Sequence, residues 1–355
     1  MKTFHCTHCQ NLIFFENVRC LACGRALAFL PDLGIMGALI ESPDGLWRAE
    51  LRQTNVRGYR LCANFDQASV CNWVVPADEA CELCCSCRLN RAIPDLSSER
   101  NVVAWYRLEL AKRRMLYTLL GLKLPVAPKS ADGAGLAFEF LENLADSDTT
   151  RVLTGHHQGL ITINIAEADD VEREKQRTLQ KEPYRTLLGH FRHEIGHYFW
   201  DRLVSRSGRL DGFRLLFGDE RADYRLALER HYRDGPPPQW EQSFISAYAA
   251  THPWEDWAES WAHYMHMVDA LETAGAAGLA LRPKRIDEPR MRPPADPLSP
   301  EQRDFDAMIE SWVSLTYVLN NLNRGLGLPD SYPFVLSAPA IEKLRFIHDT
   351  IDEQS

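Results

Sequence analysis

Residues 183–204 read PYRTLLGHFRHEIGHYFWDRLV, and we expect this stretch to form a helix. His193 and His197 are one helical turn apart, so both imidazoles can face one metal ion while Glu194 projects beside them. On a helical wheel these three side chains share one side, and apolar side chains occupy the opposite side. The alternative interpretation is an ordinary amphipathic helix whose polar face is solvated.

A second predicted helix, residues 252–271, can complete a metal site. Its helical wheel groups four polar side chains on one side: Glu255, Glu259, His263 and His266. A hydrolytic zinc ion takes three protein ligands and keeps one position open, so the two histidines need a third partner. Glu255 is the preferred third ligand.

Glu259 follows Glu255 by one helical turn, and we expect it to accept the second ring N–H of a ligand histidine. The competing interpretation is a surface carboxylate. His263 is an alternative ligand in place of either glutamate. The simpler interpretation is that His263 lies on the polar face or near the metal without binding it.

This residue set predicts metal-assisted hydrolysis. Zinc lowers the pKa of its water and polarises a carbonyl, Glu194 acts as general base, and the same carboxyl passes the proton to the leaving amine. Tyr248 precedes Glu255 closely and is a candidate donor to the oxyanion. An amphipathic tyrosine at the edge of the core is the alternative.

All ten cysteines lie between Cys6 and Cys87, a distribution that favours local metal sites in a reducing compartment over disulfides. Two CxxC pairs separated by a short segment predict a zinc ribbon; a redox dithiol is the weaker alternative. The four predicted ligands are Cys6, Cys9, Cys20 and Cys23.

A second cysteine group is less regular. Two of its cysteines stand alone. The others form two overlapping CxxC pairs, Cys81 with Cys84 and Cys84 with Cys87, and Cys85 lies inside the second pair. The spacing alone leaves the ligand set open. Closed thiolate sites have no open position for substrate, so we expect both cysteine groups to be structural.

The chain of 355 residues is predicted to be α+β, with a mainly helical domain and a small β-sheet after the ribbons. The predicted domains are residues 1–95, cysteine-rich, with two zinc sites; 96–281, the catalytic domain; and 282–355, a Pro-rich linker and helical extension packing on that domain. A helix is expected over 98–122, with an apolar stripe that includes Val103 and Tyr106. Another is expected from Ser299 to about Gly325.

Composition narrows the function classes. A formal net charge of −9 argues against nucleic-acid binding, and we find neither an apolar run of about 20 residues nor a signal peptide. We therefore expect no membrane contact and a cytoplasmic location. Three zinc ions are predicted, one catalytic and two structural.

Three stretches resemble a family of bacterial zinc-binding metallopeptidases with an N-terminal zinc ribbon: residues 153–169, residues 184–197 and residues 252–259. The resemblance covers most of the chain from Cys6 to about Leu279. It implies a gluzincin-type zincin fold, in which an edge strand, here residues 159–166, borders the cleft. Such a strand would let a peptide pair with its main chain and leave Thr162 and Asn164 to line the cleft. The alternative is a strand that is paired on both sides.

The same resemblance implies ligand roles. It favours Cys62, Cys71, Cys84 and Cys87 as the second zinc site, leaving Cys81 and Cys85 as extras. The chain is also similar, more distantly, to the catalytic domain of anthrax lethal factor, where a tyrosine and a Glu-x-x-Ala-Glu stretch stand in the same order. That similarity supports Glu255 as a ligand and Tyr248 as the oxyanion partner.

These observations predict a zinc-dependent peptidase acting on a peptide or protein substrate. One alternative is a binding or scaffold protein whose ribbons dock a protein partner and whose zincin domain is inactive. Another is a zinc hydrolase of a non-peptide amide.

Overall fold

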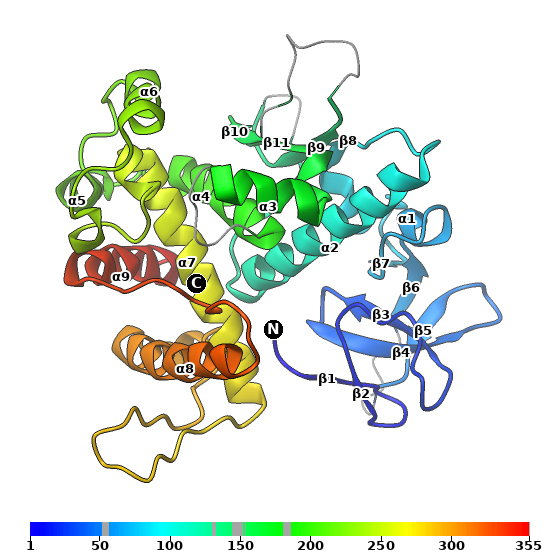
Figure 1. Cartoon of the computed structure of the whole chain (residues 1–355). Coiled ribbons are helices and arrows are strands. Elements are labelled where there is room, and N and C mark those ends of the chain that lie inside the picture. Colours follow the sequence, from blue (N-terminus) through cyan, green and yellow to red (C-terminus); the bar gives the residue numbers. More distant parts are fainter. Residues whose placement is uncertain (52–56, 130–132, 144–151, 153, 180–185, 355) are drawn as a thin grey trace. The chain divides into compact units, whose positions relative to one another are not determined.

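The computed structural model describes residues 1–51, 57–129, 133–143, 152, 154–179 and 186–354. Contacts divide the chain into two compact units (Figure 1): unit 1 contains Thr3–Gly121 and Pro125–Glu172, and unit 2 contains Leu122–Leu124 and Arg173–Ser355. The sheets lie in unit 1, whereas the elements named in the described part of unit 2 beyond residue 186 are all helices or 3₁₀ turns. The predicted α+β class is confirmed. The units do not coincide with the predicted domains, whose limits stay a prediction.

The cysteine-rich part of unit 1 is built from short strands. β1 (Phe4–His5) and β2 (Leu12–Ile13) form an antiparallel pair. An antiparallel five-stranded sheet follows in sequence order: β3 (Ala26–Leu30), β4 (Ile35–Glu41), β5 (Trp47–Ala49), β6 (Gly58–Leu61) and β7 (Val74–Pro76). Two short helical turns, α1 (Ala63–Asp66) and η1 (Cys87–Leu89), lie near the second cysteine group.

A four-stranded sheet contains the strand predicted to border a cleft. Its order is β10 (Gly155–His157), β11 (Leu160–Asn164), β9 (Ala137–Leu141) and β8 (Asn90–Ala92). β11 pairs with β10 on one side and with β9 on the other, so the predicted edge strand 159–166 is wrong. The physical reason is the tight hairpin at Gln158 and Gly159, both with positive φ, which folds β10 back over that edge.

Asn164 has a structural role at the end of β11. Its side chain is buried, donates to the Val152 carbonyl at 3.0 Å, and accepts from the Ala166 N–H at 3.0 Å to cap η2 (Ile165–Ala168). The predicted peptide cleft along a free edge of this strand is therefore wrong, because Thr162 pairs with Gly155 on one side and with Glu139 on the other.

The long helix of unit 1, α2 (Glu99–Gly121), matches its predicted span, but its buried stripe differs from the prediction. Val103 and Tyr106 are exposed, whereas Trp105 and Leu108 are buried. The buried face also holds charged side chains that neutralise one another: Lys112 Nζ lies 2.8 Å from Glu109 Oε1. A purely apolar pattern cannot reveal a helix that buries ion pairs.

Unit 2 is organised around two long helices, α4 (Leu187–Leu203) and α7 (Pro253–Ala276). Residues 183–185 of the predicted first helix lie outside the described residues, and Thr186 caps α4 by accepting from the Gly189 N–H. The remaining helices and turns are α3 (Asp170–Leu179, which begins in unit 1), α5 (Leu210–Phe217), α6 (Tyr224–Asp234), η3 (Trp240–Gln242), η4 (Ala249–Thr251), η5 (Pro300–Gln302), α8 (Phe305–Gly325) and α9 (Ala338–Asp352).

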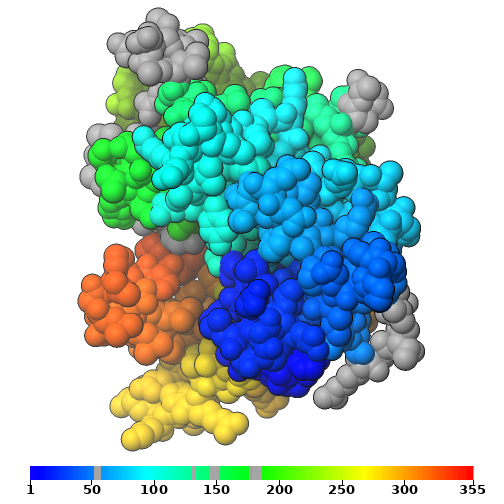
Figure 2. All heavy atoms as spheres, turned by 90° about the vertical axis from the view of Figure 1, so that its right-hand side faces the viewer, coloured from blue at the N-terminus to red at the C-terminus, as the bar shows by residue number. Residues whose placement is uncertain are grey.

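The C-terminal helices α8 and α9 pack against α7. The helix predicted from Ser299 begins later than expected: Pro300–Gln302 form only a 3₁₀ turn, and Asp304 caps α8 by accepting from the Ala307 N–H at 2.7 Å. The preceding Pro-rich segment, yellow in Figure 2, lies at the surface. Among the described residues, no helix combines the length and apolar character that spanning a bilayer requires.

Candidate metal centres

The donor atoms of His193, His197 and Glu255 converge in unit 2. Glu255 Oε2 lies 2.9 Å from His193 Nε2 and 3.6 Å from His197 Nε2, and the two Nε2 atoms are 3.2 Å apart. The three ligand atoms lie within 4.8 Å of one another. The structure therefore brings together the two predicted histidines and the preferred third donor.

Hydrogen bonding around His193 indicates what these atoms can hold. His193 Nδ1 lies 2.7 Å from Glu259 Oε1, and a carboxylate only accepts, so Nδ1 carries the proton and Nε2 presents a lone pair. That lone pair faces Glu255 Oε2, a buried atom without a hydrogen-bond partner among the described residues. Two lone pairs this close repel, so the site calls for a cation between them, either a second proton on His193 or a metal ion, and two imidazoles with one carboxylate are a donor set that suits zinc.

The predicted role of Glu259 agrees with its contacts. It also accepts a hydrogen bond of 2.6 Å from Ser246 Oγ, which in turn accepts from the Ala249 N–H at 3.0 Å. Sequence reasoning did not single out Ser246. Burial alone would lower the pKa of His193, but Glu255 and Glu259 outweigh it and raise that pKa well above the ordinary value.

Glu194 follows His193 on α4 and is almost fully buried. Burial raises the pKa of its carboxyl above the ordinary value, and the neighbouring His193 and His197 only partly offset this. A carboxylate with a raised pKa is a stronger base, which suits a group that must take a proton.

Tyr248 lies beside the histidines, with its ring centroid 5.8 Å from that of His193. Burial, followed by the charge of Glu255, raises the pKa of its phenol well above the ordinary value, so the hydroxyl keeps its proton. It is therefore available as a donor, and its part in a reaction stays a prediction.

His263 is placed away from the donor set. Its Nδ1 lies 2.7 Å from the Tyr332 hydroxyl, and its ring packs against Phe334 at a centroid distance of 4.5 Å. The alternative that His263 replaces a glutamate as ligand is therefore wrong: the metal group that the described residues form here contains Glu255 instead.

Tyr224, the first residue of α6, is a contact that sequence reasoning missed. Its hydroxyl donates a hydrogen bond of 2.6 Å to Glu255 Oε1, the oxygen that faces away from His193. Burial and the charge of Glu255 raise the pKa of the Tyr224 phenol, which keeps it a donor. No periodic or motif signal links a tyrosine on one helix to a glutamate 31 positions later on another.

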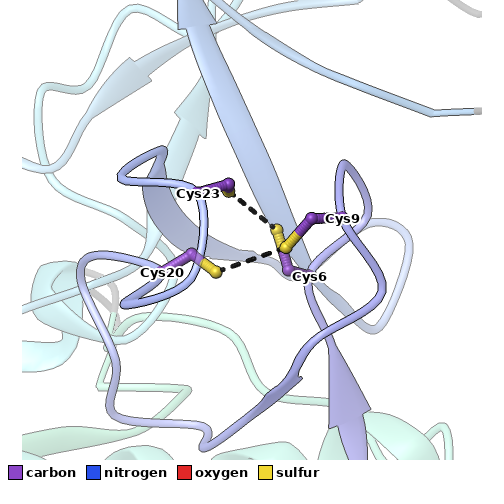
Figure 3. A group of neighbouring side chains, drawn as sticks. All are labelled: Cys6, Cys9, Cys20 and Cys23. Atoms are coloured by element: carbon purple, nitrogen blue, oxygen red, sulfur yellow. Dashed lines mark hydrogen bonds between the residues drawn. The ribbon is translucent and has the colours of Figure 1, made fainter.

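The first cysteine group forms a four-sulfur cluster (Figure 3): Cys6, Cys9, Cys20 and Cys23. Cys6 Sγ is 3.8 Å from Cys23 Sγ, and Cys9 Sγ is 3.6 Å from Cys20 Sγ. Zinc–sulfur bonds of about 2.3 Å in a tetrahedron place the sulfurs about 3.8 Å apart, whereas a disulfide needs about 2 Å. The spacing therefore fits zinc.

The second cluster consists of the four cysteines that the resemblance implied: Cys62, Cys71, Cys84 and Cys87. All four are buried, and Cys71 Sγ lies 3.7 Å from Cys84 Sγ. Backbone N–H groups donate to three of the sulfurs, which stabilises thiolates: Trp73 to Cys71, Cys84 to Cys62, and Cys87 to Cys84. Cys81 is exposed, and neither it nor Cys85 belongs to the cluster.

Comparisons with known proteins agree with this geometry. Residues 3–98 match a zinc-ribbon domain. Uncharacterized proteins of Mycobacterium tuberculosis and Mycobacterium bovis are each 45% identical to the chain over 355 residues, covering 99% of this chain and 96% of theirs. No solved structure matches. Residues 101–350 match the family described as "Putative zinc-binding metallo-peptidase", and the chain therefore belongs to that family and carries a zinc-ribbon domain at its N-terminus.

Proposed function

We propose that the protein is a zinc-dependent peptidase in which His193, His197 and Glu255 hold the catalytic metal and Glu194 is the general base. The observation that carries the proposal is the convergence of two imidazole nitrogens and one orphaned carboxylate oxygen beside a buried glutamate. Three protein donors leave the fourth position of a zinc site open, as hydrolytic sites require.

Each residue has a role that its surroundings support. His193, His197 and Glu255 would hold a zinc ion, which would lower the pKa of a bound water and polarise the substrate carbonyl. Glu194, whose pKa burial raises, accepts the proton of the attacking water and passes it to the leaving amine. Glu259 fixes the tautomer of His193 through the 2.7 Å contact with Nδ1. Tyr248 stabilises the oxyanion by donating its hydroxyl proton to a hydrogen bond.

The two cysteine clusters are proposed to hold structural zinc. Four thiolates close the coordination sphere and leave no position for substrate, so these ions would stabilise the fold of this region of short strands. Family membership implies a peptide or protein substrate. The first part of the zinc-ribbon domain, dark blue in Figure 2, carries exposed apolar side chains such as Phe14 and Leu21.

The alternative of an inactive scaffold predicts that the reactive carboxylate is lost or tied up in a structural ion pair. Glu194 is instead present and buried on the same helix as both histidines. A non-peptide amide is the remaining alternative for the substrate, and family membership favours peptides.

The test compares Glu194→Gln with Asp201→Asn, an exposed position further along α4. Both variants are expected to keep the labile zinc, because neither residue belongs to the donor set. Hydrolysis of a peptide library should be abolished in Glu194→Gln and unchanged in Asp201→Asn. Equal turnover in the two variants would remove Glu194 as the base.

A further inference from the structure

Tyr224 connects the start of α6 to the carboxylate that we propose as the third metal ligand. Its hydroxyl donates to Glu255 Oε1 at 2.6 Å, while Oε2 of the same carboxylate faces the histidine nitrogens. The two oxygens of Glu255 are thus in different environments: one meets a proton donor, and the other meets two imidazoles.

Two contacts fix the position of Tyr224: the helix cap formed by Asp223, which precedes it, and the ring of His252. Asp223 caps α6 by accepting from the Leu226 N–H at 2.9 Å. His252 packs edge-on against the Tyr224 ring at a centroid distance of 5.2 Å, and its Nε2 donates to the Ala222 carbonyl at 3.1 Å.

His252 also begins the helix that carries Glu255, because its Nδ1 accepts from the Trp254 N–H at 3.1 Å. One imidazole therefore ties the residue before Asp223 to the first turn of α7. The hydroxyl of Tyr224 is held at Glu255 by backbone geometry as well as by its own hydrogen bond.

This arrangement decides how the carboxylate can bind a metal ion. A carboxylate can present one oxygen or both, and a second oxygen would add a fifth ligand to a site that three protein donors and one open position make four-coordinate. We propose that Tyr224 is a positioning residue that occupies Oε1 and so keeps Glu255 a ligand through Oε2 alone. The inference rests on the proposed function, since it concerns the same metal.

The experiment uses the full chain with zinc retained in both cysteine clusters and the labile site emptied by mild chelation. That site is then titrated with zinc against a competing chelator, and separately filled with cobalt(II), whose visible absorption weakens when its coordination number rises from four to five. The variant is Tyr224→Phe, which removes only the hydroxyl. Tyr232→Phe, an exposed tyrosine on the same helix, is the matched control.

We expect Tyr224→Phe to raise the zinc Kd by about 10- to 100-fold, the usual effect of losing a hydrogen-bond partner of a ligand. Its cobalt absorption per bound ion should fall, because the released Oε1 can now reach the metal. Tyr232→Phe should match the unaltered chain in both measurements. Absorption per bound ion reports coordination even if the substitution also lowers the stability of the metal-free protein.

Two outcomes would overturn the inference, and they differ. If the unaltered chain binds labile metal and Tyr224→Phe leaves both the Kd and the cobalt spectrum unchanged, Tyr224 does not position Glu255, and the proposed function stands. If the unaltered chain binds no labile metal at all, the proposed metal site falls and the inference falls with it.

Discussion

The carbonyl of Gly196 accepts a hydrogen bond of 2.9 Å from the indole N–H of Trp257, which ties the HExxH helix to the helix of the third donor. Gly196 lies between the two histidines in the contact surface of α4 and α7. A Cβ atom at Gly196 would lie 3.1 Å from the Cα of Ala258 and 3.2 Å from Cβ of Trp261. The absence of a side chain at this position therefore sets the distance between the two halves of the donor set.

Gly196→Ala is expected to push α7 away from α4. Overpacking of this kind costs about 1–3 kcal/mol of unfolding free energy, measurable by urea denaturation. The labile zinc should also bind more weakly, because Glu255 moves with α7. Gly208→Ala, where a new Cβ meets nothing within 4 Å, is the control. Equal stability and equal zinc affinity in the two variants would contradict the close-packing argument.

Glu259→Gln is expected to weaken the labile zinc by about 10- to 100-fold, because the amide is a poorer partner for the Nδ1 proton of His193. Ser246→Ala should have a smaller effect on zinc binding, since it leaves the Glu259 carboxylate in place and removes the donor to its second oxygen and the acceptor of the Ala249 N–H. Competition with a chelator measures the zinc Kd of each variant. An effect of Ser246→Ala as large as that of Glu259→Gln would show that the carboxylate charge is not what matters.

The burial of His263 leads us to expect that the folded protein loses stability in acid. Burial lowers its pKa from 6.5 to about 4, and the nearby charge of Glu259 only partly opposes this. The folded state therefore favours the neutral ring: its contribution to stability is complete above about pH 6.5 and is lost as the pH falls toward 4. The loss should reach about 2 kcal/mol at about pH 5.

The measurement compares urea unfolding at about pH 7 and about pH 5, after mild chelation so that proton-driven release of the labile metal does not contribute. His263→Asn keeps an acceptor for the Tyr332 hydroxyl but cannot be protonated in this range, so its stability should fall less on acidification. The same acid-induced loss in both proteins would mean that His263 is not its source.

Lys343 on α9 and Asp256 on α7 form a buried ion pair of 2.6 Å, and the ammonium also donates to the Ser243 carbonyl at 2.8 Å. Lys343→Met should cost about 3–5 kcal/mol, because it leaves the Asp256 carboxylate buried without its cation. Adding Asp256→Asn should restore part of that loss by removing the unpaired charge. Thermal or urea unfolding compares the stability of the single variant Lys343→Met with that of the double variant. A double variant that is no more stable than the single one would argue against this explanation.

The features that were predictable from the sequence are those whose partners are close along the chain. The HExxH spacing and the first CxxC pairs each place donors within one turn or one hairpin, and Glu255 and Glu259 share a side of one helix. Tyr224 was missed because its contact with Glu255 depends on the path between two helices, which no spacing encodes.

The mistakes have the same physical origin. The edge strand was predicted wrongly because pairing on its second side depends on β10 folding back across a two-residue turn. His263 was kept as an alternative ligand because α7 was treated as having one polar face. In the structure that helix is buried on nearly all sides, and its polar residues meet different partners: Glu255 meets the histidines, and His263 meets Tyr332.

The count of zinc ions per chain tests the central claim most directly. Elemental analysis of the purified protein should give three, two resistant to mild chelation and one labile. Glu255→Ala should retain only the two resistant ions, while Glu310→Ala, an exposed glutamate on α8, should retain all three. Three ions retained in Glu255→Ala would contradict the assignment of Glu255, and with it the proposed catalytic site.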